Sequence, residues 1–281
     1  GLPRQLAGAD FPDLVRRIAA ARRAGRPVLV GMGAHVIKVG LNPVLIDLLR
    51  RGVITALALN GAGMIHDTEI AMVGRTSEEV AEVLNAAIRD GAARGIGIGQ
   101  AVGETLLANR FPHNYQSLLA QAAALGVPVT VHVAMGTDII HIHPGADGAA
   151  IGQAGHHDFR VFCRLVSDLE GGAYLDVGSA VLLPEVFLKA LTLVRNLGYP
   201  VKRFTTANFD FIRHYRPATN VVHRPTLEGG KGFHFTGHHE LMLPLLAAAV
   251  LDALDQHPGE EVGPETVSAP ATGRPCGGTG L

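Results

Sequence analysis

Tryptophan is absent from this 281-residue chain, and aromatic residues make up only 5% of it. Proteins that bind single-stranded nucleic acid stack the bases on aromatic side chains, so this composition argues against such a role. The net charge is −1 and no long basic run occurs, whereas a nucleic-acid backbone is bound by clustered Lys and Arg. The sequence therefore predicts no nucleic-acid partner.

Long apolar runs and cysteines are also scarce. No stretch approaches the roughly 18 residues of a membrane span, and no basic segment followed by an apolar one indicates a signal peptide. Cys163 and Cys276 are too few for a disulfide framework, and reduced thiols are typical of the cytosol. We therefore expect a cytoplasmic protein without a membrane partner.

Short apolar segments alternate regularly with amphipathic ones. The expected strands cover residues 27–30, 54–59, 127–133, 173–177 and 203–209, with short β segments at 221–222 and 233–235. The expected helices cover residues 10–22, 42–51, 79–94, 115–125, 159–170, 184–197 and 241–254, and residues 76–79 form a capping box. This alternation predicts an α/β, Rossmann-like fold with a mostly parallel sheet and helices on both faces.

The domain organisation follows from composition. Residues 1–257 are expected to form a single α/β nucleotide-binding catalytic domain, because nothing marks a second one. Residues 258–281 are rich in Pro and Gly and are typical of a C-terminal tail. The glycine-dense stretch at residues 91–103 predicts a flexible loop or lid.

Glycines gather where the predicted strands end. They occur in GMGAH (31–35), LNGAG (59–63), GTDIIHIHP (136–144) and LDVGSA (175–180). Ligands of open α/β sheets bind outside the carboxyl ends of the strands, and glycine lets backbone N–H groups approach a phosphate or ribose. Several such loops indicate a ligand-binding enzyme rather than a scaffold. The first loop has Val36 in place of the third glycine of G-x-G-x-x-G, so it fits either a nucleotide site or a tight strand-to-helix turn.

Histidines form a second pattern. His141-x-His143 would point both rings to one side of a strand, with Asp138 nearby. Imidazole and carboxylate are the ligands of a catalytic divalent metal such as zinc. The same side chains can instead act as general bases or substrate contacts near neutral pH, or serve structure alone. The residues leave these three interpretations open.

Two lysines and two acids complete the candidates. Lys38 and Lys231 lie near glycines, where an amine could hold an anion or, if desolvated, form a Schiff base, with a solvated surface lysine as the alternative. Asp67 and Glu69 could bind a ribose hydroxyl or an amine. They could also simply start the next helix, because acids favour a helix N-terminus.

Several segments resemble deoxyhypusine synthase, in order along residues 31–254. GAHVIKVGLNPVLIDLLRRGVITALALNGAG is similar to the early cofactor-binding segment of that family, and VPVTVHVAMGTDIIHIH to its I-P-V…G-D-M-I…H segment. LDVGSAVLLPEVFLKALTLVRNLG, RFTTANFD and HHELMLPLLAAAVLDAL are similar to its later strands and helices. The chain resembles a divergent member of the deoxyhypusine synthase-like superfamily.

This resemblance implies an NAD-binding fold with six or seven parallel strands, and a tetramer with active sites at subunit interfaces. It implies that Asp138 takes the place of a substrate-binding carboxylate and that Lys231 is the counterpart of the imine-forming lysine. It places the cofactor along His35, Lys38, Asn60, Gly61, Ala62, Thr206 and Ala207, and the glycine loops add Gly33 and Gly63.

The chain also departs from the family pattern. No tryptophan precedes Lys231, and Arg and His at residues 213–217 and 223–225 replace an acid-rich stretch. Guanidinium groups bind carboxylate or phosphate through two hydrogen bonds, so this replacement suits an anionic substrate. The substrate-binding candidates are Asp67, Glu69, Arg216, Arg224 and His238.

The sequence therefore predicts a homo-oligomeric enzyme, a dimer or tetramer, that binds NAD or another nucleotide at the carboxyl edge of the sheet. The expected reaction is a redox-assisted transfer or elimination on a small polar, anionic substrate. The catalytic candidates are Asp138, His141, His143 and Lys231. One alternative is a metal-dependent hydrolase or lyase that uses His141, His143 and Asp138 on a phosphorylated substrate, and another is a non-catalytic nucleotide sensor.

Overall fold

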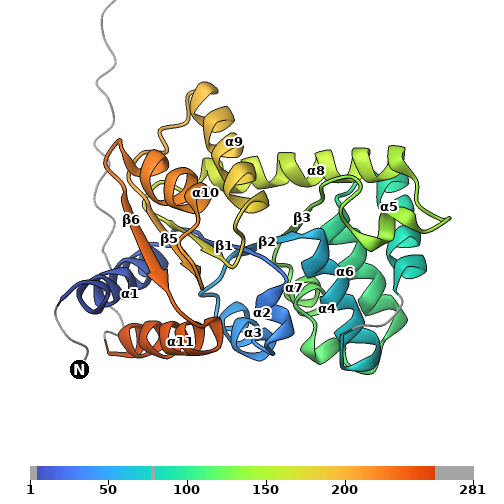
Figure 1. The fold of residues 1–281 in the computed structure, drawn as a ribbon, viewed down its shortest axis with the longest axis horizontal. Coiled ribbons are helices and arrows are strands. Elements are labelled where there is room, and N and C mark those ends of the chain that lie inside the picture. The colour runs from blue at the N-terminus through green and yellow to red at the C-terminus, as the bar shows by residue number, and fades with distance from the viewer. Residues whose placement is uncertain (1–4, 77–79, 257–281) are drawn as a thin grey trace, which may run out of the picture.

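A computed structural model describes residues 5–76 and 80–256 and shows a six-stranded sheet in the order β3-β2-β1-β4-β5-β6. All five strand pairings are parallel (Figure 1). The strands are β1 (Val28–Met32), β2 (Ala56–Asn60), β3 (Val129–His132), β4 (Ala173–Val177), β5 (Thr205–Asp210) and β6 (Lys231–Thr236). The predicted α/β fold with a parallel sheet is confirmed.

Helices cover both faces of this sheet, with α8 and α9 on one side and α1 and α11 on the other (Figure 1). The helices are α1 (Ala7–Arg23), α2 (His35–Lys38), α3 (Asn42–Arg50), α4 (Gly61–Val73), α5 (Ala81–Arg94), α6 (Ile98–Asn109), α7 (Leu118–Leu125), α8 (Gly148–Ser167), α9 (Leu182–Asn196), α10 (Tyr215–Pro217) and α11 (His239–Asp255). Short helical turns are η1 (Asn114–Gln116), η2 (Ile139–Ile142), η3 (Ala218–His223) and η4 (Arg224–Thr226). Strands β1 to β5 are buried almost throughout, as expected for a parallel sheet covered on both faces.

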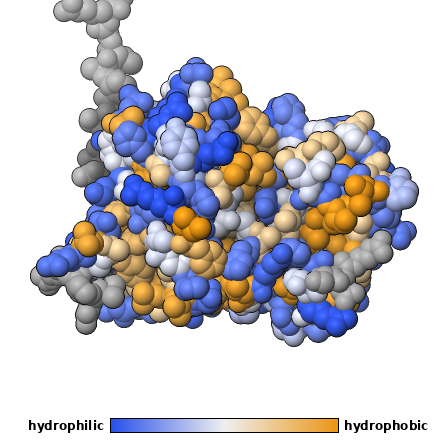
Figure 2. Space-filling view, in the orientation of Figure 1, coloured by the Kyte–Doolittle hydropathy of each residue, from blue (hydrophilic) through white to orange (hydrophobic). Residues whose placement is uncertain are grey.

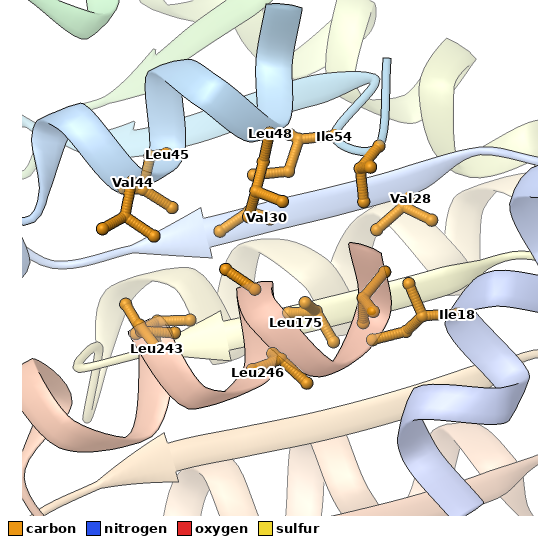
Figure 3. A pocket seen from close by; sticks show the side chains of 14 residues that line it. Ile18, Val28, Val30, Val44, Leu45, Leu48, Ile54, Leu175, Leu243 and Leu246 are labelled. Atoms are coloured by element: carbon orange, nitrogen blue, oxygen red, sulfur yellow. The ribbon is translucent and has the colours of Figure 1, made fainter. Parts of the chain in front are cut away.

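Each face has its own apolar core. On one face Leu29 and Tyr174 of the sheet pack with Phe162 of α8 and Phe187 of α9, and the Tyr174 and Phe187 rings stack 3.9 Å apart. On the other face α1, α3 and α11 cover β1 and β4 around a purely aliphatic cavity of about 30 Å³ (Figure 3). A space of this size, without a polar group in its lining, is a small packing void rather than a ligand site.

The glycine-dense residues 91–103 are not a loop or lid. Helix α5 ends at Arg94 and is capped by Gly95, whose φ is +70°, and α6 begins at Ile98. A Cβ at Gly99 would overlap the carbonyl oxygen of Val129, and one at Gly103 would lie 2.9 Å from the carbonyl oxygen of Leu119. These glycines allow α6 to pack closely against β3 and α7. Glycine content alone does not distinguish such a packing role from a flexible loop.

Two further expectations about local structure are wrong. His141 lies in the 3₁₀ turn η2 rather than in a strand, so His141-x-His143 does not place two rings on one side of a sheet. Residues 221–222 belong to the π-helical turn η3 instead of a β segment. Most of the predicted capping box at 76–79 and the predicted tail at 258–281 lie outside the described residues. Within the described chain no helix is long and apolar enough to cross a membrane.

Candidate functional site

The strand order reverses between β1 and β4, which is where open α/β sheets bind ligands. Gly33 follows β1 and Gly178 follows β4, and the Gly33 N–H donates to the Val177 carbonyl at 3.0 Å. A Cβ at Gly33 would overlap the Gly178 carbonyl oxygen, and Gly178 itself has a φ of +65°. The two loops therefore pack main chain against main chain at this switch point, with the His239 ring lying directly against Gly178.

Aromatic and imidazole rings converge beside the two glycines. The Phe211 ring lies 4.9 Å from the ring of His35, 4.7 Å from that of His239 and 5.3 Å from that of His238. The loops after β1, β5 and β6 thus meet at one place. His35 and His238 were predicted as site residues and His239 belongs to the same His-His-Glu run as His238, whereas Phe211 was missed because a lone phenylalanine after a strand carries no motif.

His239 is held in one tautomer. Its Nε2 lies 3.1 Å from the Phe209 carbonyl oxygen, which can only accept, so Nε2 carries the proton. Its Nδ1 is buried and has no hydrogen-bond partner among the described residues. Burial lowers the pKa of His239, so the ring is neutral at physiological pH. The site therefore contains an unused imidazole acceptor.

A buried acid adds to this edge of the sheet. Asp176 of β4 is 0% exposed, and neither carboxyl oxygen has a hydrogen-bond partner among the described residues. Burial and the neighbouring carboxyl of Asp210 raise the pKa of Asp176 well above its ordinary value, which favours the protonated form. Asp210 ends β5, with Oδ2 3.8 Å from the Nε2 of His214.

Asp176 belongs to a polar row across three strands. Asn208 pairs with Asp176 in the β4–β5 register, and the Asn208 Nδ2 lies 3.2 Å from the Nδ1 of His234 on β6. The Oδ1 of Asn208 and the Nε2 of His234 are also buried without partners in the described structure. The sequence carries a signal for this row, since Asp and Asn interrupt apolar strands at LDV and ANF, but it lies within the strands and not in the glycine loops.

A second group forms where β2 and β3 end. A Cβ at Gly61 would overlap the Asp138 carboxylate, which shows how closely Asp138 packs on the first turn of α4. The backbone N–H groups of Gly136 and Asp138 donate to the Nδ1 of His141 at 3.1 and 3.3 Å. Asn60 caps the same helix, since its Oδ1 accepts the N–H of Gly63 at 2.8 Å. The structure thus brings predicted catalytic and cofactor residues together.

Burial changes the acidity of the carboxyl in this second group. Burial raises the pKa of Asp138, while the nearby His141 acts in the opposite direction. Since the Nδ1 of His141 accepts backbone N–H groups, its neutral form carries the proton on Nε2, which is buried without a partner in the described chain. The second group therefore contains a partly buried carboxyl and a buried imidazole N–H without a partner in the described chain.

The expected metal ligand set is not assembled. The Nδ1 of His143 accepts the N–H of Gly145 at 3.0 Å within its own turn, and the Nδ1 of His141 is engaged as described above. Over residues 5–76 and 80–256, no three His, Cys, Asp or Glu side chains are placed to hold a metal ion. The alternative with His141, His143 and Asp138 as ligands finds no support in this arrangement.

Four residues that were predicted to contact the substrate or the cofactor are buried inside the protein. Asp67 is 0% exposed and accepts the N–H groups of Leu118 and Leu119 at 2.8 and 2.9 Å, which ties α4 to the start of α7. Glu69 is also buried and its Oε2 lies 2.6 Å from the Nδ1 of His66. Thr206 and Ala207, both 0% exposed, lie in the middle of β5 rather than at its end.

The remaining cations are spread over the molecule. Lys38 is exposed at the end of α2, near the switch point. Arg216 forms an ion pair with Glu185 of α9, with its Nε 3.5 Å from the Oε1 of Glu185. Arg224 lies in η4, in the segment that returns from the end of β5 to the start of β6. Lys231 is the first residue of β6 and therefore lies at the amino edge of the sheet. A six-residue strand is about 17 Å long, so Lys231 does not join the Asp138–His141 group.

This arrangement defines a Rossmann-like α/β protein with its candidate site at the carboxyl edge of the sheet. No protein-family model and no curated protein matches the sequence. Solved structures share the fold: AgrE, in a ternary complex with ornithine and NAD+, superimposes with a TM-score of 0.54 at 16% identity over 88% of this chain. The chain spans only 33% of the length of AgrE.

Two further structures support the same fold. A conserved protein assigned to the LOR/SDH type, from Methanococcus maripaludis S2, gives a TM-score of 0.52 at 15% identity over 90% of this chain and 70% of its own. A protein assigned as a deoxyhypusine synthase, from Entamoeba histolytica, gives 0.54 at 11% identity over 88% of this chain and 89% of its own. Identities this low establish the shared fold.

Proposed function

We propose that this protein is an enzyme that binds NAD at the carboxyl edge of its sheet and acts on a small polar substrate. The observation that carries the proposal is the pair of glycine loops packed at the switch point, at Gly33 and Gly178, bordered by the ring cluster of His35, Phe211 and His239. AgrE, which shares the fold, was solved with NAD+ and ornithine.

The residues at this edge fit a dinucleotide. Gly33 keeps the loop after β1 close to the loop after β4, Lys38 would supply positive charge for phosphate, and His35 would offer a ring nitrogen as a hydrogen-bonding group. Helix α2 has only four residues, so side-chain charge rather than a helix dipole would carry this attraction. Asn60, Gly61, Ala62 and Gly63 at the start of α4 would extend the surface. NAD, when bound, supplies a hydride acceptor.

The proton chemistry would fall to the chain's own side chains. Asp138 and His141 lie in the segment after β3, where the Asp138 backbone N–H donates to the His141 ring, and either side chain could hold or move a proton; His143 lies two residues further along. Asp176 near the end of β4 and His239 after β6 extend this set, one as a buried carboxyl with a raised pKa and one as a free imidazole acceptor. This combination suits a redox-assisted transfer or elimination, with Arg216 and His238 near enough to this edge to bind an anionic group.

The location of the cofactor site is tested by titrating NAD+ into matched variants. Lys38→Ala removes an exposed cation at the carboxyl edge and should weaken NAD+ binding by roughly tenfold, because a phosphate contact is lost. Lys202→Ala is the control, since Lys202 is an exposed lysine paired with Glu228 at the other edge. Equal affinities for all three proteins would contradict this placement.

We also propose that the protein assembles as a cytoplasmic homo-oligomer. Large apolar side chains are exposed on the loop after β3, where Met135 and Ile139 are each 59% and Ile142 is 79% exposed. Figure 2 shows hydrophobic surface in this region. Clustered exposed apolar side chains of this kind favour a protein contact. Light scattering of the purified protein would measure the assembly directly, and a monomer at all concentrations would contradict it.

A further inference from the structure

A second hollow lies at the amino edge of the sheet, opposite the candidate active site. It has a volume of about 360 Å³ and opens where β1, β4 and β5 begin. Three arginines line it: Arg17 of α1, Arg26 just before β1 and Arg203 just before β5. This volume falls within the usual range for small-molecule sites, about 300–1,000 Å³.

The three guanidinium groups keep unused donors. Arg203 uses its Nε for Glu170 at 3.0 Å, and Arg17 uses its Nε for Asp13 at 3.3 Å. The side chain of Arg26 makes no hydrogen bond or ion pair with any described residue. A guanidinium has five N–H donors, so each arginine retains donors that point to no protein acceptor.

Glycines form the floor under two of these side chains. A Cβ at Gly171, whose φ is +75°, would lie 3.4 Å from the Cγ of Arg26. A Cβ at Gly229, whose φ is +120°, would lie 3.3 Å from the Cγ of Arg203. The aliphatic stems of both arginines therefore lie directly on backbone at the lining of the hollow.

The surroundings add positive charge. Lys231 lies at the start of β6, where its Nζ is 5.5 Å from the centre of the Phe233 ring and has no ion pair within the described residues. Clustered charges of one sign in a hollow strengthen the local field, and guanidinium groups match phosphate oxygens through paired hydrogen bonds. Lys231 is too far from the carboxyl edge to act there, but its charge can attract an anion to this hollow.

We propose that this hollow is a binding site for a small polyanion that carries a di- or triphosphate group, separate from the NAD site. The ligand's phosphate oxygens accept hydrogen bonds from Arg26 and Arg203, with Arg17 and Lys231 adding charge at its margin. The hollow lies at the edge of the sheet opposite the candidate active site, so a ligand here is not placed as the substrate.

Calorimetric titration with inorganic tripolyphosphate tests the site. Wild-type protein should bind it with saturation, and Arg26→Ala/Arg203→Ala should bind roughly tenfold more weakly or not at all. Both arginines are exposed, and Glu170 keeps the backbone N–H groups of residues 202 and 203, so the double variant should fold. Arg160→Ala, which removes an exposed arginine of α8, is the control for general charge attraction.

Three results would overturn the proposal. The first is no binding by the wild type, and the second is equal affinity in the double variant. The third is an equal loss in Arg160→Ala, which would show attraction to net charge alone. A loss in Lys38→Ala with retention in Arg26→Ala/Arg203→Ala would instead place the anion at the carboxyl edge.

Discussion

Gly33 and Gly178 lie in contact across β1 and β4, so closely that a Cβ on Gly33 would overlap the Gly178 carbonyl oxygen. Gly33→Ala should therefore force the two loops apart, lower the free energy of unfolding by about 1–3 kcal/mol and abolish NAD+ binding. Chemical denaturation and NAD+ titration would measure both effects.

Gly148→Ala is the matched control for this substitution. Gly148 begins α8, and a Cβ there would meet no atom within 4 Å. Alanine at this position should be neutral or slightly stabilising, because it reduces the freedom of the unfolded chain. If Gly33→Ala were as stable as Gly148→Ala and still bound NAD+, the switch point would tolerate side chains and the proposed site would be misplaced.

Two buried groups beside β3 should give opposite pH dependences of stability. Burial raises the pKa of Asp158 from 3.8 to about 7, so the folded state holds more protons than the unfolded state between pH 4 and 7, and Asp158 makes stability fall as pH rises. Burial lowers the pKa of His132 from 6.5 to about 4, so His132 makes stability rise over pH 4 to 6.5.

These two effects largely cancel in the wild type below pH 6.5. Asp158→Asn should expose the rising contribution of His132, and His132→Gln the falling contribution of Asp158, each about 3–4 kcal/mol over its window. Urea denaturation across pH 4 to 8 would measure the slopes. Parallel pH profiles for the two variants would contradict the assigned protonation states.

Asp176→Asn should separate function from stability. Burial raises the pKa of Asp176, which has no hydrogen-bond partner in the described structure, so an amide of the same shape should leave the protein at least as stable as the wild type, and more so as pH rises. The variant should nevertheless lose roughly tenfold or more in turnover, because an amide cannot give up or take a proton in the proposed reaction. Thermal unfolding and activity would be read together; a marked loss of stability with full turnover would assign Asp176 to the fold alone.

The layers of the fold were predictable because strand and helix periodicities are local. The segments ending in Gly31, Asn60 and Val177 are short apolar runs, and each became a buried parallel strand. Local pattern did not predict the helices within residues 91–103. The glycines at 99 and 103 make contacts with β3 and α7, which are remote in sequence.

The candidate site was only partly predictable for the same reason. Asp67 looked like a ligand contact, but its partners at Leu118 and Leu119 lie some 50 residues away. Asp176 looked like an ordinary strand residue, and its significance depends on Asn208 and Asp210, which only the sheet register brings beside it. Pairings between distant strands carry no signal within a short sequence window.

The most direct measurement is nucleotide binding by the purified protein. Denatured protein would be examined by mass spectrometry for released nucleotide, and ligand-free protein would then be titrated with NAD+. We predict released NAD near one per chain, or saturable binding that Lys38→Ala weakens. No released nucleotide together with no binding up to about 1 mM NAD+ would contradict the assignment of an NAD-binding enzyme.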